Sequence, residues 1–137
     1  MALSTSLKSK AYMVEKTVTL GTASGTVVGP SVPANTMVIG AGIEFVTAPG
    51  SAATSATVAI GDGTTDNLAA VTMQAQAAGT ILGGVVPSFV SSADTIDAVQ
   101  AVVGAGLVAA TARIWAIVVD VNENTKNAAE VDRDTLA

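Results

Sequence analysis

The stretch GDGTTDN at residues 61–67 holds the residue types best suited to binding chemistry. Asp62 and Asp66 supply two carboxylates, and the threonines and Asn67 supply neutral oxygens, which are ligands that a hard cation such as calcium prefers. The spacing is not that of an EF-hand loop, which needs acidic residues at alternate positions and a distal glutamate. Asp-Gly and Asp-Asn pairs also favour a β-turn, because these residues tolerate left-handed backbone. We therefore predict a turn, assign no metal ligand and leave cation binding by this loop open.

The common kinds of catalytic machinery are missing from the sequence. It contains no histidine and no cysteine, which excludes the usual general base, a thiolate nucleophile and cysteine-type zinc sites. Asp94 and Asp97 lie three residues apart, but two carboxylates need contrasting surroundings for acid–base work, and a solvated strand end explains them. The serine and threonine hydroxyls lack a base to activate them, because every lysine lies near a terminus. We predict no enzyme, no catalytic residue and no cofactor.

Two charged residues lie alone within apolar segments. Glu44 directly precedes Phe45, and Arg113 is the single charge between residues 111 and 119. They can form an ion pair across strands or between subunits, although an exposed face is the simpler interpretation. Trp115, the single tryptophan, is interpreted as a core or interface anchor. Since residues 114–119 are apolar on both faces, their strand is either central in a sandwich or covered by another subunit.

Alternating hydrophobicity predicts strands as the elements that carry these residues. The clearest cover residues 12–20, 37–48 and 56–61, and residues 95–103 and 111–121 are predicted to form a hairpin around the loop 104–110. Gly40 and Gly42 fall on one face of their strand, where a neighbouring layer can approach closely or the strand can bend. The segment 68–78 is compatible with helix or strand. About seven to nine short strands separated by Gly, Pro, Asn and Asp turns predict an all-β fold.

The predicted architecture is a single-domain antiparallel β-sandwich, jelly-roll-like, or a barrel. The domain covers residues 12–121, preceded by a flexible N-terminal arm at 1–11 and followed by a polar C-terminal tail at 122–137. The chain has 137 residues, of which 50% are hydrophobic and 12% charged, and its mean hydropathy is +0.56. Such a composition leaves apolar surface that a monomer hides poorly, which indicates assembly.

The distribution of charge excludes two classes of partner. The net charge is −5, and residues 17–112 contain no lysine or arginine, so the body of the domain offers no basic face for nucleic acid. The longest apolar stretch, residues 98–119, contains Arg113, and a charge inside a span costs on the order of 3 kcal/mol. We therefore predict no membrane partner. The start MALSTSLKSK lacks the apolar core of a secretory signal.

Three stretches resemble a known family. VPANTMVIGAGIEFVTA (32–48), SATVAIGDGTTDN (55–67) and the closing strand ARIWAIVVDV (112–121) are similar to small virion proteins of tailed bacteriophages, namely head decoration (cement) proteins. The similarity covers residues 32–66 and 95–121, and the Ala/Gly-rich segment 68–84 departs from the pattern. The resemblance implies a β-sandwich that oligomerises, often as a trimer, on the outer surface of the capsid and clamps neighbouring subunits of the major capsid protein.

The placement of basic residues suggests how such a protein meets a capsid. Residues 1–16 hold three lysines and one glutamate, so this segment could meet an acidic capsid surface. The candidate partner contacts are Lys8, Lys10, Tyr12 and Trp115. One alternative is a trimeric tail-fibre or adhesin-type module that binds a host-surface glycan, although only four aromatic residues are available for stacking. Another is a surface-layer or pilus protein completed by a neighbour's strand, against which the missing signal argues.

Overall fold

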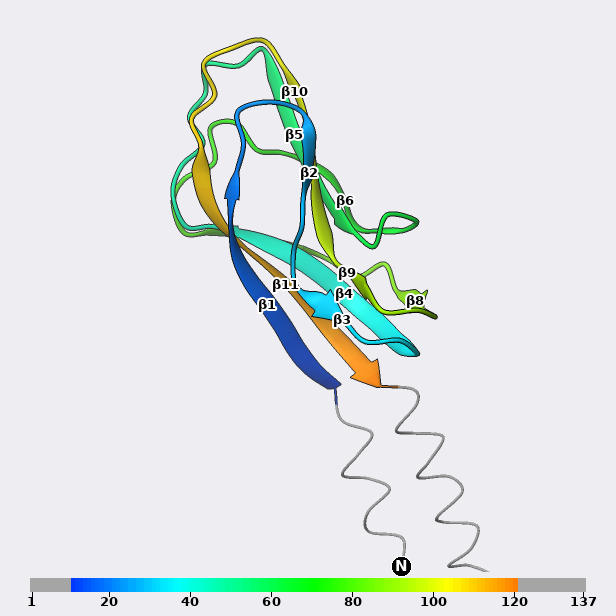
Figure 1. Ribbon diagram of the computed structural model, residues 1–137. Coiled ribbons are helices and arrows are strands. Elements are labelled where there is room, and N and C mark those ends of the chain that lie inside the picture. Colours follow the sequence, from blue (N-terminus) through cyan, green and yellow to red (C-terminus); the bar gives the residue numbers. More distant parts are fainter. Residues whose placement is uncertain (1–10, 121–137) are drawn as a thin grey trace, which may run out of the picture.

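A computed structural model describes residues 11–120, which form eleven strands and no helix. Most strands belong to two antiparallel sheets that enclose one core (Figure 1). The strands are β1 (Ala11–Leu20), β2 (Gly25–Val27), β3 (Ser31–Val32), β4 (Thr36–Phe45), β5 (Ser55–Gly61), β6 (Asp66–Thr72), β7 (Thr80–Gly84), β8 (Ser88–Val90), β9 (Asp94–Thr95), β10 (Asp97–Val103) and β11 (Ala110–Asp120). The predicted all-β sandwich is confirmed, and the strands outnumber the expected seven to nine because of two-residue pieces such as β3 and β9.

The strand order is that of a jelly roll. Sheet A has the order β1-β11-β4-β7, with β8 also paired to β4, and sheet B has the order β2-β10-β5-β6. First and last strands therefore pair, as do β2 with β10, β4 with β7, and β5 with β6, which is the pattern of one long hairpin rolled into a sandwich. The small β3–β9 sheet follows the same rule. Jelly rolls occur in viral capsid and lectin domains, and the fold alone does not decide between such functions.

The predicted hairpin of residues 95–103 and 111–121 is wrong. β10 lies in sheet B between β2 and β5, whereas β11 lies in sheet A between β1 and β4. The loop between them crosses from one sheet to the other, and Gly104 and Gly106 adopt φ values of 90° and 95° that favour glycine. The two segments are neighbours in the sequence, which favours pairing. In a jelly roll, however, early strands pair with late strands, so β10 pairs with β2 and β11 pairs with β1. Among the described strands only β5 and β6 form a hairpin of consecutive strands.

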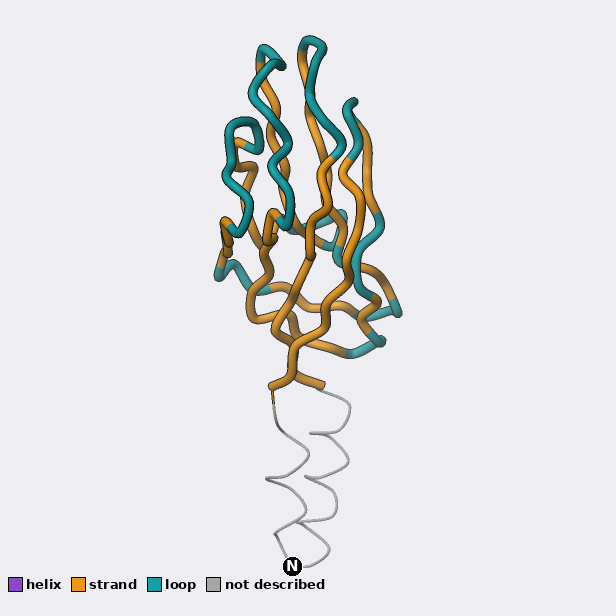
Figure 2. The backbone as a smooth tube through the Cα atoms, turned by 90° about the vertical axis from the view of Figure 1, so that its left-hand side faces the viewer, coloured by secondary structure: helices purple, strands orange, loops and turns teal. Residues whose placement is uncertain are grey.

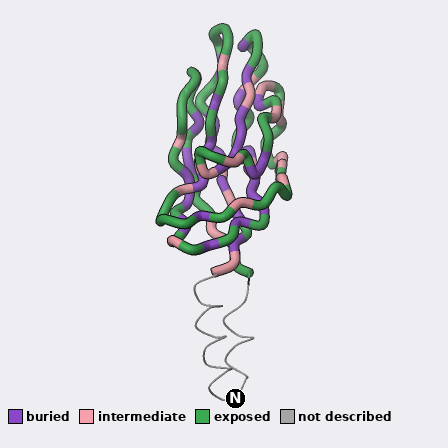
Figure 3. The backbone as a smooth tube through the Cα atoms, turned by 90° about the vertical axis from the view of Figure 1, so that its right-hand side faces the viewer, coloured by how far each residue is buried: buried purple, intermediate pink, exposed green. Residues whose placement is uncertain are grey.

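The core lies between the two sheets and is built mainly from alternate residues of the longer strands, together with loop residues such as Met73 and Leu107 (Figure 3). In sheet A, Ile43 and Phe45 of β4 and Ile114 of β11 are fully buried, and Val58 and Ile60 of β5 face them from sheet B. Burying each large aliphatic or aromatic side chain contributes roughly 1.5–3 kcal/mol. Of the four aromatic residues only Phe45 belongs to this core, so the aliphatic residues supply most of its stabilisation.

The ambiguous segment 68–78 is half strand and half turn. Residues up to Thr72 belong to β6, where Leu68 pairs with Ile60 of β5 and is buried. The chain then turns, with Ala75 at a φ of 62° and Gly79 at a φ of 88°. Pairing with β5 prevails over the helix propensity of the alanines and glutamines because it buries Leu68 in the core.

Both ends of the described chain lie at the same end of sheet A (Figure 2). Ala11 pairs with Val119 because β1 and β11 are antiparallel neighbours over their whole length. The first strand begins at Ala11, one residue before the predicted domain start. The rest of the predicted arm and the predicted tail at 122–137 lie outside the described residues.

Candidate functional site

The outer face of sheet A, which points away from the core, holds the most developed surface feature. Trp115 of β11 stands on this face opposite Gly42 of β4, and Gly83 of β7 pairs with Gly42 on the other side. A Cβ atom built on Gly42 would lie 2.3 Å from Trp115 Cζ2, and one built on Gly83 would lie 2.9 Å from both Cζ2 and Cη2. The indole therefore lies over two glycines. The sequence predicted that a neighbouring layer approaches the glycine-bearing face of β4 or that the strand bends there; at Gly42 the space is taken instead by a side chain of the adjacent strand in the same sheet.

Beside the indole runs a groove of about 300 Å³. It is lined by Met13, Glu15, Glu44, Ile81, Arg113, Trp115 and Ile117. These residues come from β1, β4, β7 and β11, so the groove crosses the whole width of sheet A. Its walls are aliphatic and its floor is aromatic, with three charged residues at one side. We call this feature the Trp115 groove.

The charged side of the Trp115 groove is an ion-pair cluster centred on Arg113. Arg113 Nη2 donates to Glu44 Oε1 at 3.2 Å, and Nη1 lies 3.6 Å from Glu15 Oε2. Glu44 faces Arg113 directly across the β4–β11 pair, so the anticipated cross-strand ion pair forms on a partly exposed face. Ion pairs this exposed contribute at most about 1 kcal/mol. Their larger effect is to neutralise charge on a surface that is otherwise apolar.

The apolar surface continues beyond the groove toward β8. Met37 of β4 and Phe89 of β8 pair directly and are both exposed on the outer face. Val85, in the loop after β7, is 86% exposed. Met37, Phe89 and Ile81 are not among the residues that the sequence marks as candidate contacts. Alternation within each strand shows that these residues share a face of their own strand. It does not show that β7 and β8 both pair with β4, which is what brings them onto one surface.

Of the four predicted contact residues, the structure places Tyr12 and Trp115, and they lie on opposite faces of sheet A. Trp115 lies on the outer face of sheet A, whereas Tyr12 pairs with Val118, a core residue, and so stands on the opposite face. Tyr12 lies near the start of β1 and is 41% exposed. Lys8 and Lys10 lie outside the described residues. Lys16 Nζ donates to the Val28 carbonyl oxygen at 3.2 Å, so this lysine bridges neighbouring sheet edges.

The loop 61–67 is the turn of the β5–β6 hairpin. Asp62 Oδ1 accepts hydrogen bonds from the backbone N–H groups of Thr64 (2.9 Å) and Thr65 (2.7 Å), which is the geometry of an Asx turn. The loop and residues 89–94 line a hollow of about 200 Å³ in which the carboxylates are those of Asp62 and Asp94. Within residues 11–120 no group of three or more acidic side chains could hold a metal ion. The turn interpretation is confirmed.

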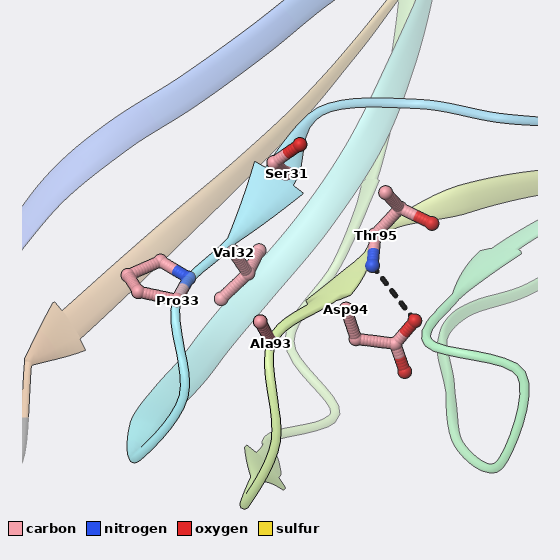
Figure 4. A pocket seen from close by; sticks show the side chains of 6 residues that line it. All are labelled: Ser31, Val32, Pro33, Ala93, Asp94 and Thr95. Carbon is pink, nitrogen blue, oxygen red and sulfur yellow. Dashed lines mark hydrogen bonds between the residues drawn. The ribbon is translucent and has the colours of Figure 1, made fainter.

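The other two acidic residues of interest cap backbone groups. Asp94 Oδ1 accepts from the N–H of Thr95 at 2.8 Å, and Asp97 Oδ1 accepts from the N–H of Gly29 at 3.1 Å. Asp94 also borders a shallow hollow of about 570 Å³ beside the β3–β9 sheet (Figure 4). Its other lining residues are Ser31, Val32, Pro33, Ala93 and Thr95. One carboxylate among apolar and hydroxyl side chains gives no arrangement for acid–base chemistry.

No protein-family model and no curated protein matches the sequence. Among solved structures, a chain of the cyanophage Pam1 capsid asymmetric unit superposes with a TM-score of 0.61 and 15% identity, covering 82% of this chain and 86% of that one. A chain of the acid-stable capsid of Helicobacter pylori bacteriophage KHP30 gives a TM-score of 0.52 and 12% identity, covering 80% and 89%. At these identities the likeness is one of fold. The described residues contain no helix long and apolar enough to cross a membrane.

Proposed function

We propose that this chain is a structural, non-enzymatic protein of a tailed-bacteriophage virion. Its specific role is that of a decoration (cement) protein, which binds the outer surface of the head and stabilises contacts between subunits of the major capsid protein. The observation that carries the proposal is the fold. Chains in two phage capsid structures share it over at least four fifths of both partners, and such coverage means that they are of similar length to this chain.

The properties of the surface support an assembly role. A contiguous apolar face with charges paired among themselves suits a lasting protein contact, because little charge must be desolvated without a partner. We further propose that the protein acts as a homotrimer. Three weak capsid contacts on one body bind together 10²–10⁴-fold more tightly than one alone, provided that their geometry allows simultaneous binding. This gain would let a small protein clamp capsid subunits.

The end of sheet A at which Ala11 and Asp120 lie is the proposed capsid-facing end. Tyr12 is exposed there, and the basic residues Lys8 and Lys10 precede it in the chain. An acidic capsid surface would attract this segment, and the attraction would weaken with salt. The test is co-sedimentation of the full chain with heads assembled from the capsid protein of the same virus.

The expected result is binding at a fixed stoichiometry and a higher disruption temperature of the heads. K8E/K10E should weaken binding, and more so at low salt, whereas K126E/R133E is the matched control because it also reverses two basic charges, near the other terminus. No co-sedimentation of the wild type at any salt concentration would refute the decoration role. A loss of binding in K126E/R133E equal to that in K8E/K10E would refute a specific role of Lys8 and Lys10 in the capsid contact.

A glycan-binding module is the second candidate, and the Trp115 groove is the observation that favours it. An indole on a sheet surface beside Glu15, Glu44 and Arg113 offers a stacking face together with hydrogen-bonding groups, which is what a sugar ring requires. Three of the four aromatic residues lie outside the core, so the shortage of exposed aromatics is a weaker objection than the sequence suggested. A glycan array separates the candidates: a specific hit abolished by W115A supports a lectin-type role.

A further inference from the structure

We infer that copies of this chain associate through the outer face of sheet A, and that side chains bordering the Trp115 groove of one copy enter the groove of the other. The inference rests on the proposed assembly role. Because the contact is reciprocal, it joins two copies about a two-fold axis, so it links proposed trimers rather than forming them. The apolar part of this face comprises Met13, Met37, Ile81, Phe89, Trp115 and Ile117.

The area of this face is close to what an interface between copies needs. Five of its six apolar side chains are between 39% and 61% exposed. At roughly 150–250 Å² for a large side chain, they leave on the order of 500 Å² of apolar surface. That value lies in the upper half of the ~300–600 Å² range for the largest patch on a typical monomer, and such patches are often functional. Each partner in a standard interface buries ~800 Å². The remaining area of this face comes from the half-buried Trp115, the charged cluster and the glycine backbone.

The charges of the face indicate a partner of the same kind. Arg113 is shared by Glu44 and Glu15, so the face presents a surplus of only one carboxylate and does not demand a strongly basic partner. Glu15 lies on the edge strand β1 and is the most exposed of the three, so its charge can stay at the solvated rim. A second copy brings a face of equal hydrophobicity with the same single surplus carboxylate, and because Glu15 stays at the rim of both copies no unpaired charge has to be buried.

The shape of the face is also complementary to a copy of itself. Met13 on β1 and Ile81 on β7 form two ridges, with exposed fractions of 56% and 61%, on either side of a groove floored by Trp115. Gly42 and Gly83 lower the floor between them. Two such faces can pack sheet on sheet at the usual spacing of about 10 Å, with a ridge of each copy in the groove of the other. The outer face of sheet B also exposes Val99 and Val103, but the small residue Ala101 lies between them on β10 and Ala59 lies opposite Val99 on β5.

The test measures self-association of the full chain without heads. Sedimentation velocity over a concentration series gives the dissociation constant, and the emission of Trp115, the only tryptophan, reports on the groove itself. We expect reversible association with a shift of the emission to shorter wavelength as concentration rises. M13E and I81E should each weaken association at least tenfold. V103E is the matched control, because Val103 is also 61% exposed but lies in sheet B.

The outcomes separate this inference from the proposed function. A wild type that stays monomeric at its highest soluble concentration, with unchanged Trp115 emission, overturns the inference even if it binds heads. Association weakened by V103E as much as by I81E also overturns it, provided that circular dichroism shows all variants folded. A glycan that binds the groove and leaves the protein monomeric overturns it as well. Association through this face with no binding to heads supports the inference and refutes the decoration role.

Discussion

The indole of Trp115 lies so close to Gly42 that a Cβ atom on the glycine would come within 2.3 Å of Cζ2. The strand pairing explains this, because Trp115 and Gly42 are directly opposite across β11 and β4 on the outer face. A side chain at position 42 would push the indole away from the outer face of sheet A. The glycine thus lets the largest side chain of the protein lie low on an outer face, where it forms the floor of a groove.

Replacing the glycines under the indole should disturb the Trp115 groove in a graded way. G42A should destabilise the fold by at least about 2 kcal/mol, because its Cβ would also lie 2.3 Å from the Leu82 carbonyl oxygen. G83A meets only the indole at close range and should cost about 1 kcal/mol while shifting the emission of Trp115 to longer wavelength. Chemical denaturation and fluorescence measure both effects. G25A, with nothing within 4 Å of the new Cβ, should change neither, and a loss equal to that of G42A would contradict the explanation.

The Arg113 cluster should contribute little to stability. A double-mutant cycle with R113M and E44Q should give a coupling energy of about 0.5 kcal/mol, since both side chains are partly exposed. The coupling should fall when salt is raised toward 1 M, where the screening length is about 3 Å. Urea unfolding at low and high salt measures it. A coupling above about 2 kcal/mol that salt does not change would show that the pair is far less solvated than this geometry implies.

Asn67 lies in β6 of sheet B, but its side chain should stabilise the edge of sheet A. Its side chain is fully buried, and Nδ2 donates to the Val86 carbonyl oxygen at 2.8 Å and to Ser88 Oγ at 3.0 Å. N67A should therefore cost about 1–3 kcal/mol and speed amide exchange in β8. The control is Q76A, which removes an exposed bond to the Thr72 carbonyl oxygen and should cost less than about 0.5 kcal/mol. Equal losses in the two variants would contradict a clamping role for Asn67.

Local patterns predicted the elements of the fold but not their neighbours. Alternation of apolar residues located β1, β4, β5 and β11, and turn residues identified the loop 61–67. The pairing of residues 95–103 with 111–121 was predicted wrongly, because short-range pairing is the usual case for consecutive strands. Only the global arrangement pairs β11 with β1 across nearly the whole chain, and no local pattern encodes that choice.

The same limit applies to the candidate site: its charged residues and its tryptophan could be predicted from local patterns, but its other lining residues could not. Glu44 and Arg113 stood out as lone charges in apolar strands, and Trp115 stood out by its type. Met13 and Ile81, on opposite sides of the groove, come from strands far apart in the sequence. They line the same groove only because β1 and β7 flank the β11–β4 pair. Alternation alone does not show whether Met13 and Ile81 face the core or the solvent. In a protein that assembles, both faces of a strand can be apolar.

The most direct test of the central claim is a cryo-electron microscopy reconstruction of heads assembled with and without the full chain. The proposal predicts extra density on the outer surface of the head at symmetry-related positions, with a jelly-roll domain that bridges neighbouring capsid subunits. Identical reconstructions from the two samples, at protein concentrations that saturate any binding seen by sedimentation, would contradict it.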